Sequence, residues 1–103
     1  MEWHEQIEKA QGFQWDSGNS RKNEHKHQVS CEEAEQVFFN QPLMLLDDPK
    51  HSKNELRIRA FGKNNAGRLL TISFTLREDL IRIISARSMH RKERTIYEEQ
   101  NKK

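Results

Sequence analysis

The spacing of apolar residues changes once along the chain, from a helical period to the alternation of strands. Four apolar residues fall on one face of a helix: Cys31, Ala34, Val37 and Phe38. Ser30 and Glu33 match the capping-box pattern that opens a helix, and Asn40 and Pro42 follow as stop signals. We therefore expect a helix that begins after Ser30 and ends before Asn40.

Strand-like segments follow one another over residues 43–87. Four of them are separated by turn-forming sequences: LMLLDD (43–48), ELRIRAFG (55–62), RLLTISFTL (68–76) and LIRIISAR (80–87). Short connections favour antiparallel pairing, so this part is predicted to form a four-stranded meander. Ser88 is a suitable N-cap for a last helix that runs to about Glu99 and has a thin apolar face.

The N-terminal part of the chain has weaker signals. FQWD (13–16) alternates like a short strand, whereas the following segment, SGNSRKNEHKH, contains no apolar side chain. A helix there has N-cap candidates at Asp16, Ser17 and Ser20 but no apolar stripe to bury. Residues 1–12 are interpreted as an extension and residues 13–103 as one domain. The order of elements predicts an α+β fold with N-terminal helices, a four-stranded antiparallel sheet and a C-terminal helix.

Charge is distributed unevenly in this 103-residue chain, although its net charge is only +2. Residues 1–66 hold 9 Lys and Arg against 11 Asp and Glu, while residues 67–103 hold 9 against 5. Because 33% of the residues are hydrophobic and another 33% are charged, the core must be small. The basic C-terminal part indicates an anionic partner such as nucleic acid, although charge runs in general are more often solvated surface.

Several classes of protein are disfavoured by the composition. Cys31 is the single cysteine, which leaves no intrachain disulfide and suits a reducing compartment. The sequence has no apolar run of transmembrane length and no signal-peptide pattern at its start, so we expect a cytoplasmic protein without a membrane partner. The five histidines occur without an HExxH motif or a CxxC pair, so neither a metal site nor a cofactor is predicted.

Five motifs occur in one order and spacing: FxWD at 13–16, NxxKH at 23–27, EEAxxVFF at 32–39, DDPxHxxxExR at 47–57 and IRIISARxxxRxERxxYE at 81–98. This set resembles the BrnT family of bacterial toxins over about nine-tenths of the chain. The resemblance implies a fold related to RelE-type toxins and a ribonuclease that arrests translation and growth as the toxin of a type II toxin–antitoxin pair. It also implies a cognate, BrnA-like antitoxin in a heterotetramer that binds operator DNA through the antitoxin.

Two positions depart from the pattern of that family. Asn19 stands where the family usually has Lys, and Gln28 stands where it has Gly after the KH pair. A glycine there suits a left-handed helix C-cap, which Gln adopts only at an energetic cost. The end of the first helix, and with it the placement of Lys26 and His27, therefore stays open.

RNA cleavage without a metal needs a base for the 2′-hydroxyl, an acid for the leaving 5′-oxygen and cations for the phosphorane. The family resemblance directs attention to six residues as catalytic candidates: His27, Lys26, Glu55, Arg57, Arg82 and Arg87. His27 and Glu55 are titratable candidates, Lys26 is a further cation, and the arginines can hold phosphate in bidentate fashion. For Arg59, which shares the strand parity of Arg57, an ordinary solvated position is expected.

Arg82 and Arg87 point to opposite faces of a regular strand, so either a bulge re-aims one of them or only one is catalytic, and Arg87 is preferred. The spacings of 4 and 3 between Arg87, Arg91 and Arg94 place them on one side where a helix begins around Ser88. A strand that ends at Arg87 beside this helix is predicted to form a cationic rim for RNA, with Arg91 and Arg94 as RNA-binding residues. Glu93 could orient an arginine. Tyr97 could stack on a base, although sealing the edge of the core is the role expected of it. The competing hypothesis is a non-catalytic module that binds nucleic acid or a partner through the same rim.

Overall fold

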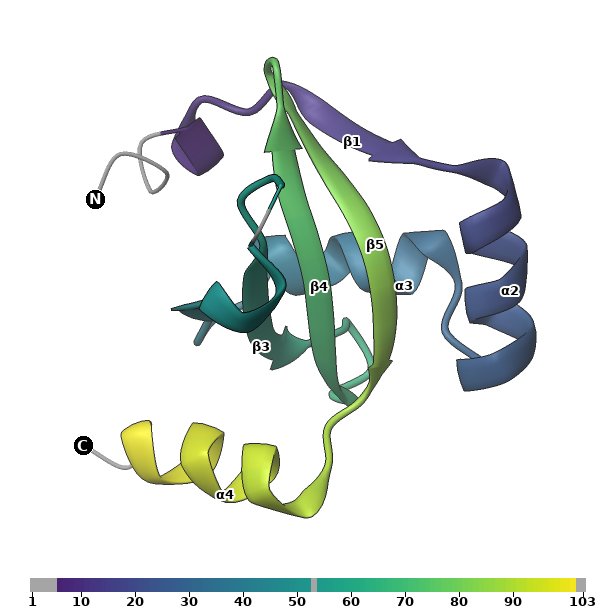
Figure 1. The fold of residues 1–103 in the computed structure, drawn as a ribbon. Helices are drawn as coiled ribbons and strands as arrows, with labels where there is room; N and C mark the ends of the chain where they lie inside the picture. Colours follow the sequence, from purple (N-terminus) through teal and green to yellow (C-terminus); the bar gives the residue numbers. More distant parts are fainter. Residues whose placement is uncertain (1–5, 53, 102–103) are drawn as a thin grey trace.

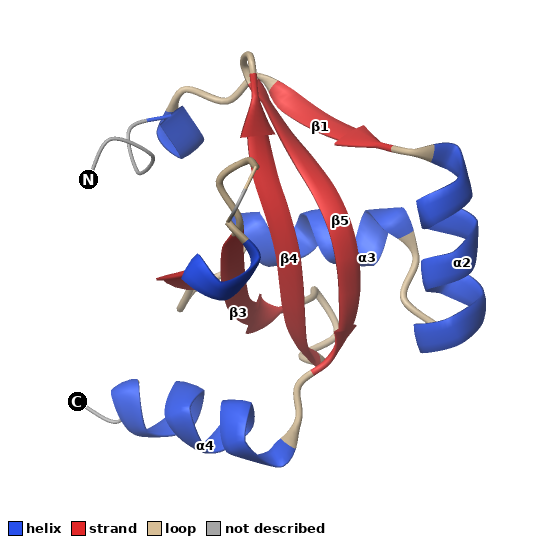
Figure 2. Cartoon of the chain, viewed as in Figure 1, coloured by secondary structure: helices blue, strands red, loops and turns tan. Residues whose placement is uncertain are grey.

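The computed structural model describes residues 6–52 and 54–101, and these form a five-stranded sheet with helices around it (Figures 1 and 2). The strand order is β1-β5-β4-β3-β2. In chain order the elements are β1 (Gly12–Trp15), α2 (Ser17–His27), α3 (Cys31–Gln36), the 3-10 turn η1 (Val37–Phe39), β2 (Met44–Asp47), the 3-10 turn η2 (Pro49–His51), β3 (Ile58–Lys63), β4 (Leu69–Arg77), β5 (Leu80–Ser88) and α4 (Arg91–Gln100).

The sheet has one strand more than the sequence predicted. The antiparallel meander of β2, β3, β4 and β5 is present, but β1 adds to its β5 edge in parallel orientation, so the prediction of a purely antiparallel four-stranded sheet was wrong. Gly12 aligns with Leu80 and Trp15 with Ile83, and the Gln11 N–H donates to the Asp79 carbonyl at 2.8 Å. The strand β1 has only four residues, and its partner β5 lies far along the chain. No local sequence pattern therefore predicts this pairing.

One face of the sheet carries the main core, and α3 covers it (Figure 1). Alternate residues of β3, β4 and β5 bury here, and α3 with η1 contributes Ala34 and Val37. Phe38 packs its ring against Phe13 and Phe74, with centroids 5.4 and 5.1 Å away. The capping box predicted at Ser30 and Glu33 is confirmed, and the helix ends in the η1 turn before Asn40.

The polar segment 17–27 is a helix, α2, with Asp16 as its N-cap. It docks through a buried asparagine instead of an apolar stripe. The Asn23 side chain accepts from the backbone N–H of Ala86 at 2.8 Å and donates to the Val29 carbonyl at 3.3 Å. Satisfying both ends of a buried amide fixes α2 beside β5 at little desolvation cost. Between Gly12 and Gln36 the chain therefore forms the strand β1 followed by the helices α2 and α3.

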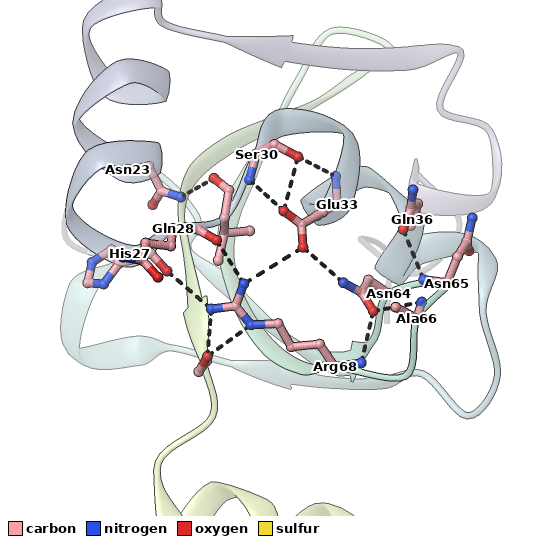
Figure 3. Close-up of polar contacts among 12 residues, drawn as sticks. Asn23, His27, Gln28, Ser30, Glu33, Gln36, Asn64, Asn65, Ala66 and Arg68 are labelled. Atoms are coloured by element: carbon pink, nitrogen blue, oxygen red, sulfur yellow. Dashed lines mark hydrogen bonds and ion pairs between the residues drawn. The ribbon is translucent and has the colours of Figure 1, made fainter.

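Arg68 fastens the C-terminal end of α2 (Figure 3). Its guanidinium donates to the backbone carbonyls of Gln28 and His27, at 2.8 and 3.2 Å, and to the hydroxyl of Ser88. Gln28 takes the left-handed C-cap conformation (φ 56°, ψ 40°) that a glycine would take more easily, so α2 ends as the family pattern implies. In Figure 3 the imidazole of His27 points away from the Arg68 network.

A second, smaller cluster lies under α4 on the opposite face of the sheet. Phe61, Met89 and Tyr97 are buried there, and the Tyr97 hydroxyl donates to the Pro42 carbonyl at 2.6 Å, which confirms its expected sealing role. The prediction of Ser88 as N-cap was wrong, because β5 runs through Ser88 and α4 begins only at Arg91. None of the described helices is long and apolar enough to cross a membrane.

Candidate active site

β5 contains a bulge that decides which of its side chains share a face. Its register with β4 pairs Ser73 with Ser85 but Phe74 with Ile83, so Ile84 is an extra residue in β5. Upstream of the bulge the buried residues are odd-numbered, whereas downstream of it Ala86 is buried. The bulge therefore inverts the parity of the strand.

This inversion places Arg82 and Arg87 on the same face. Arg82 lies opposite Thr75 and Arg87 lies opposite Thr71, and directly opposed residues of antiparallel strands point the same way. Of the two possibilities left open by the sequence, the bulge is the one observed. The shared face is the one that α3 leaves uncovered, toward the viewer in Figure 1.

An open cavity of about 620 Å³ lies on this face, between η2 and β5. Arg59, Ser73 and Ser85 are aligned side by side on β3, β4 and β5, so two small hydroxyl side chains form part of its floor. Neighbouring strands lie about 5 Å apart, which lets guanidinium groups from both sides of these serines reach one phosphate. The charged or titratable residues that line the cavity are Asp48, Lys50, His51, Arg57, Arg59 and Arg87.

Glu93 of α4 holds Arg87 in place by a bidentate ion pair. The two Nη atoms of Arg87 donate to the two carboxylate oxygens at 2.7 and 2.9 Å, and Thr71 and the His90 N–H donate to the same carboxylate. Burial alone would raise the pKa of Glu93, but these hydrogen bonds and the Arg87 charge lower it to about 2. Arg59 adds a longer ion pair, with 3.6 Å between Nη1 and Oε2. Glu93 is thus an ionised anchor, as the sequence suggested.

His27 and Lys26 approach the same face from the side of α2. They line a smaller cavity that shares Ile84 and Ser85 with the large one, so the two cavities meet at the bulge. Burial, followed by the charges of Lys26 and Arg87, lowers the pKa of His27 below its ordinary value of 6.5. His27 is therefore neutral near pH 7 and able to accept a proton.

Two of the predicted site residues lie away from this centre. Glu55 precedes β3 and pairs with Arg77 at 3.5 Å, in a cavity that adjoins the large one through Lys50, His51 and Arg57. Arg82 lies five positions before Arg87 and approaches Asp16 at 4.0 Å, toward the N-terminus of α2.

Arg91 and Arg94 are exposed in the first turn of α4. Arg87 lies near the end of β5, where its guanidinium is held by Glu93 of the helix that follows. Arg91 and Arg94 keep their helical spacing and extend the cationic surface along α4.

Comparison with known proteins places these residues in a family. A sequence model described as the ribonuclease toxin, BrnT, of a type II toxin–antitoxin system matches residues 15–93. The match covers 79 of the 103 residues, including all the charged cavity residues named above. The chain belongs to the BrnT family. Its members are ribonuclease toxins of type II systems, so RNA is the target and a cognate antitoxin is the partner.

A solved structure supports the fold. The crystal structure of the Brucella abortus ribonuclease toxin BrnT superposes with a TM-score of 0.58 and 19% identity, over 78% of this chain and 97% of that one. At this identity the likeness concerns the fold alone. Among curated proteins, no sequence matches the chain significantly.

Sequence reasoning missed two residues of the site in this BrnT-family chain. Arg59, expected to be merely solvated, has a half-buried side chain in the cavity and lies 3.8 Å from Asp48 and 3.6 Å from Glu93. His51, in the DDPxH motif, lies on the cavity wall, and its ring is hydrogen-bonded to the carboxylate of Asp48 in the same turn. The strand parity that Arg59 shares with Arg57 could have indicated Arg59 as a site residue. The position of His51 within the DDPxH motif could have indicated His51. Within residues 6–52 and 54–101, no three His, Cys, Asp or Glu side chains could together hold a metal ion.

Proposed function

We propose that this BrnT-family chain cleaves RNA without a metal ion, in the cavity on the open face of the sheet. The observation that carries the proposal is that Arg57, Arg59 and Arg87 all line a cavity floored by Ser73 and Ser85. Attack of a 2′-hydroxyl on its own phosphate builds charge on the phosphorane oxygens, and preorganised guanidinium groups stabilise that charge. The attacking oxygen is already tethered beside the phosphate, so positioning supplies much of the rate.

His27 takes the proton of the 2′-hydroxyl in this mechanism. Its lowered pKa makes the neutral imidazole available at pH 7, and its cavity meets the arginine cavity at the bulge. Lys26 supplies a further cation on the same side, and Arg57 and Arg87 bind the scissile phosphate. Glu55 is the other titratable candidate for proton transfer. It lines the neighbouring cavity, together with Lys50 and Arg57.

The remaining arginines extend the substrate path beyond one phosphate. Arg82 lies on the same face of β5 toward α2, and Arg91 and Arg94 are exposed on α4. Evenly placed cations along a groove hold a polynucleotide backbone and make its binding salt-dependent. We propose that the RNA runs along β5, from Arg82 past the bulge to α4.

The same cationic face suits the antitoxin. An acidic antitoxin segment laid over the arginines would block the RNA and be attracted by the same charges. We propose that the cognate, BrnA-like antitoxin silences the toxin in this way, in a cytoplasmic heterotetramer that binds operator DNA through the antitoxin. Release of the toxin then arrests translation and growth.

The test is RNA cleavage by the purified protein in the presence of EDTA, free of antitoxin. Wild type should cut a defined oligonucleotide and leave a 2′,3′-cyclic phosphate, whereas Arg87→Ala should not. Because Arg87→Ala leaves the buried Glu93 without its partner, the double variant Arg87→Ala/Glu93→Gln must be run beside Glu93→Gln alone. Arg21→Ala, an exposed change on α2, is the control.

Two outcomes count against a nuclease. Binding of RNA with a steep salt dependence but no cleavage by wild type would favour the binding-module hypothesis. Equal cleavage by wild type and the double variant would remove Arg87 from the site.

A further inference from the structure

Asp48 and His51 form a dyad on the cavity wall opposite α2. Nδ1 of His51 lies 3.1 and 3.0 Å from the two carboxylate oxygens of Asp48. The Asp48 side chain is only 7% exposed, whereas the His51 side chain is 60% exposed and lines the cavity that holds Arg57, Arg59 and Arg87. Because a carboxylate only accepts hydrogen bonds, Nδ1 carries the proton and Nε2 is the nitrogen left for the cavity.

The turn that carries the dyad is tied down at both ends. The Ser52 hydroxyl donates to the Asp48 carbonyl at 2.7 Å and accepts from the Arg57 N–H at 2.9 Å. The Asp48 N–H donates to the Arg57 carbonyl at 3.0 Å, which extends the β2–β3 ladder into the turn. In Figure 1 the η2 turn, in teal, lies in front of β3 and beside β4, on the side of the open face. Its anchoring preorganises His51 relative to β3, as a catalytic group requires.

We propose that His51 is a second catalytic residue of the RNA cleavage, the general acid that protonates the leaving oxygen, and that Asp48 is its positioning residue. This rests on the proposed function, because it supplies the acid that the mechanism above lacks. An imidazole that is oriented by a carboxylate on one ring nitrogen, and exchanges a proton through the other, is a recurring arrangement in active sites.

The step balances with two histidines. Neutral His27 takes the proton of the 2′-hydroxyl, the 2′-oxygen forms a bond to phosphorus, and the bond between phosphorus and the 5′-oxygen breaks with its electron pair on that oxygen. His51 enters as the imidazolium and gives its Nε2 proton to the 5′-oxygen. The products are a 2′,3′-cyclic phosphate and a 5′-hydroxyl, and exchange with water returns each histidine to its starting form.

The two histidines lie on different sides of the site, which fits one of them acting as the base and the other as the acid. His27 lines the smaller cavity from α2, His51 lines the larger one from η2, and the two cavities share Ile84 and Ser85 between them. In-line displacement puts the attacking and leaving oxygens on opposite sides of the phosphorus, so a base and an acid on opposite sides of the bound phosphate fit the reaction. Burial and the neighbouring cations Lys26 and Arg87 favour the neutral form of His27, which suits the base.

The decisive experiment replaces the leaving 5′-oxygen by sulfur. A thiolate leaves without a proton, so a 5′-phosphorothiolate oligonucleotide removes the need for an acid but not for a base. His51→Ala should cleave the normal oligonucleotide about 10²–10⁴-fold more slowly than wild type and the sulfur substrate within about tenfold of it. Asp48→Asn should show a smaller loss with the same rescue, because it misplaces the acid without removing it. His27→Ala should be slow on both substrates, and His25→Ala, exposed on α2, should match wild type on both.

The failures are distinguishable. Wild type that leaves both substrates intact would overturn the proposed function itself. Wild-type cleavage with equal losses for His51→Ala on both substrates would overturn the acid role alone and leave Asp48–His51 as a device that closes the turn. Unchanged cleavage of the normal substrate by His51→Ala would do the same.

Discussion

Replacement of Glu93 by Gln tests the anchor that holds Arg87. The substitution keeps the shape of the side chain and removes the charge, so Arg87 loses both charge-assisted hydrogen bonds while Thr71 can keep a partner. The pKa of Glu93 is lowered from its ordinary 4.5 to about 2, mainly by the Arg87 hydrogen bond working against burial. Each pKa unit is worth about 1.4 kcal/mol, so the ionised carboxylate contributes roughly 3 kcal/mol to folding at pH 7.

The sign of the pH dependence follows from the direction of the shift. Because the folded-state pKa is below the unfolded-state value, the contribution is complete above about pH 4.5 and is lost as the pH falls toward 2. Linkage then predicts that the stability advantage of wild type over Glu93→Gln, which does not titrate at this position, falls by about 2 kcal/mol between pH 7 and pH 3. Urea unfolding of the two proteins across this range measures it directly.

The critical result is how the stability difference between wild type and Glu93→Gln changes with pH. A difference that stays constant between pH 7 and pH 3, or that is below about 0.5 kcal/mol at pH 7, would mean that the ion pair does not carry the stability assigned to it. The same variant should lose cleavage activity more than it loses fold, because a released Arg87 is no longer held in the lining of the cavity.

Three further predictions concern α2 and η1. Gln28→Gly should raise the free energy of unfolding by about 0.5–1 kcal/mol in urea titrations, because glycine removes the strain of the left-handed C-cap; a loss of stability would contradict that cause. Phe38→Ala should cost about 3 kcal/mol by thermal or urea unfolding, whereas Phe39→Ala, on a side chain 76% exposed, should cost less than about 1 kcal/mol; equal losses would mean that the Phe38 ring is not packed as described. Lys26→Gln should raise the pKa of His27 in an NMR titration, since it removes a neighbouring cation, and an unmoved titration would place Lys26 too far away to matter.

The elements with their own apolar period were predictable from sequence, and the ones that depend on distant partners were not. The capping box at Ser30 and the alternation in β4 are local signals, and both are confirmed. The helix α2 has no such signal, because its docking depends on the single amide of Asn23 meeting the backbone of Ala86, 63 residues later. The parallel pairing of β1 with β5 likewise depends on where α2 and α3 return the chain.

The same distinction applies to the site. Sequence reasoning proposed Arg57 and Arg87, and both line the cavity. It set Arg59 aside as solvated, because strand parity tells which face a residue occupies but not whether a turn and a helix will enclose that face. The structure adds η2 on one side and Glu93 of α4 on the other, and these make Arg59 part of an ion-pair network.

The bulge at Ile84 explains how a short basic strand can serve both the core and the cavity. In a strand of regular alternation, burying Ile81 and Ile83 would send Arg87 to the core side, where an unpaired guanidinium is prohibitively costly. One extra residue lets Ala86 continue the buried row while Arg87 joins Arg82 on the open face. Because Ile84 is the extra residue, its deletion would leave a strand of regular alternation that still has Ile81, Ile83 and Ala86 on the core face and Arg82 and Arg87 on the open face.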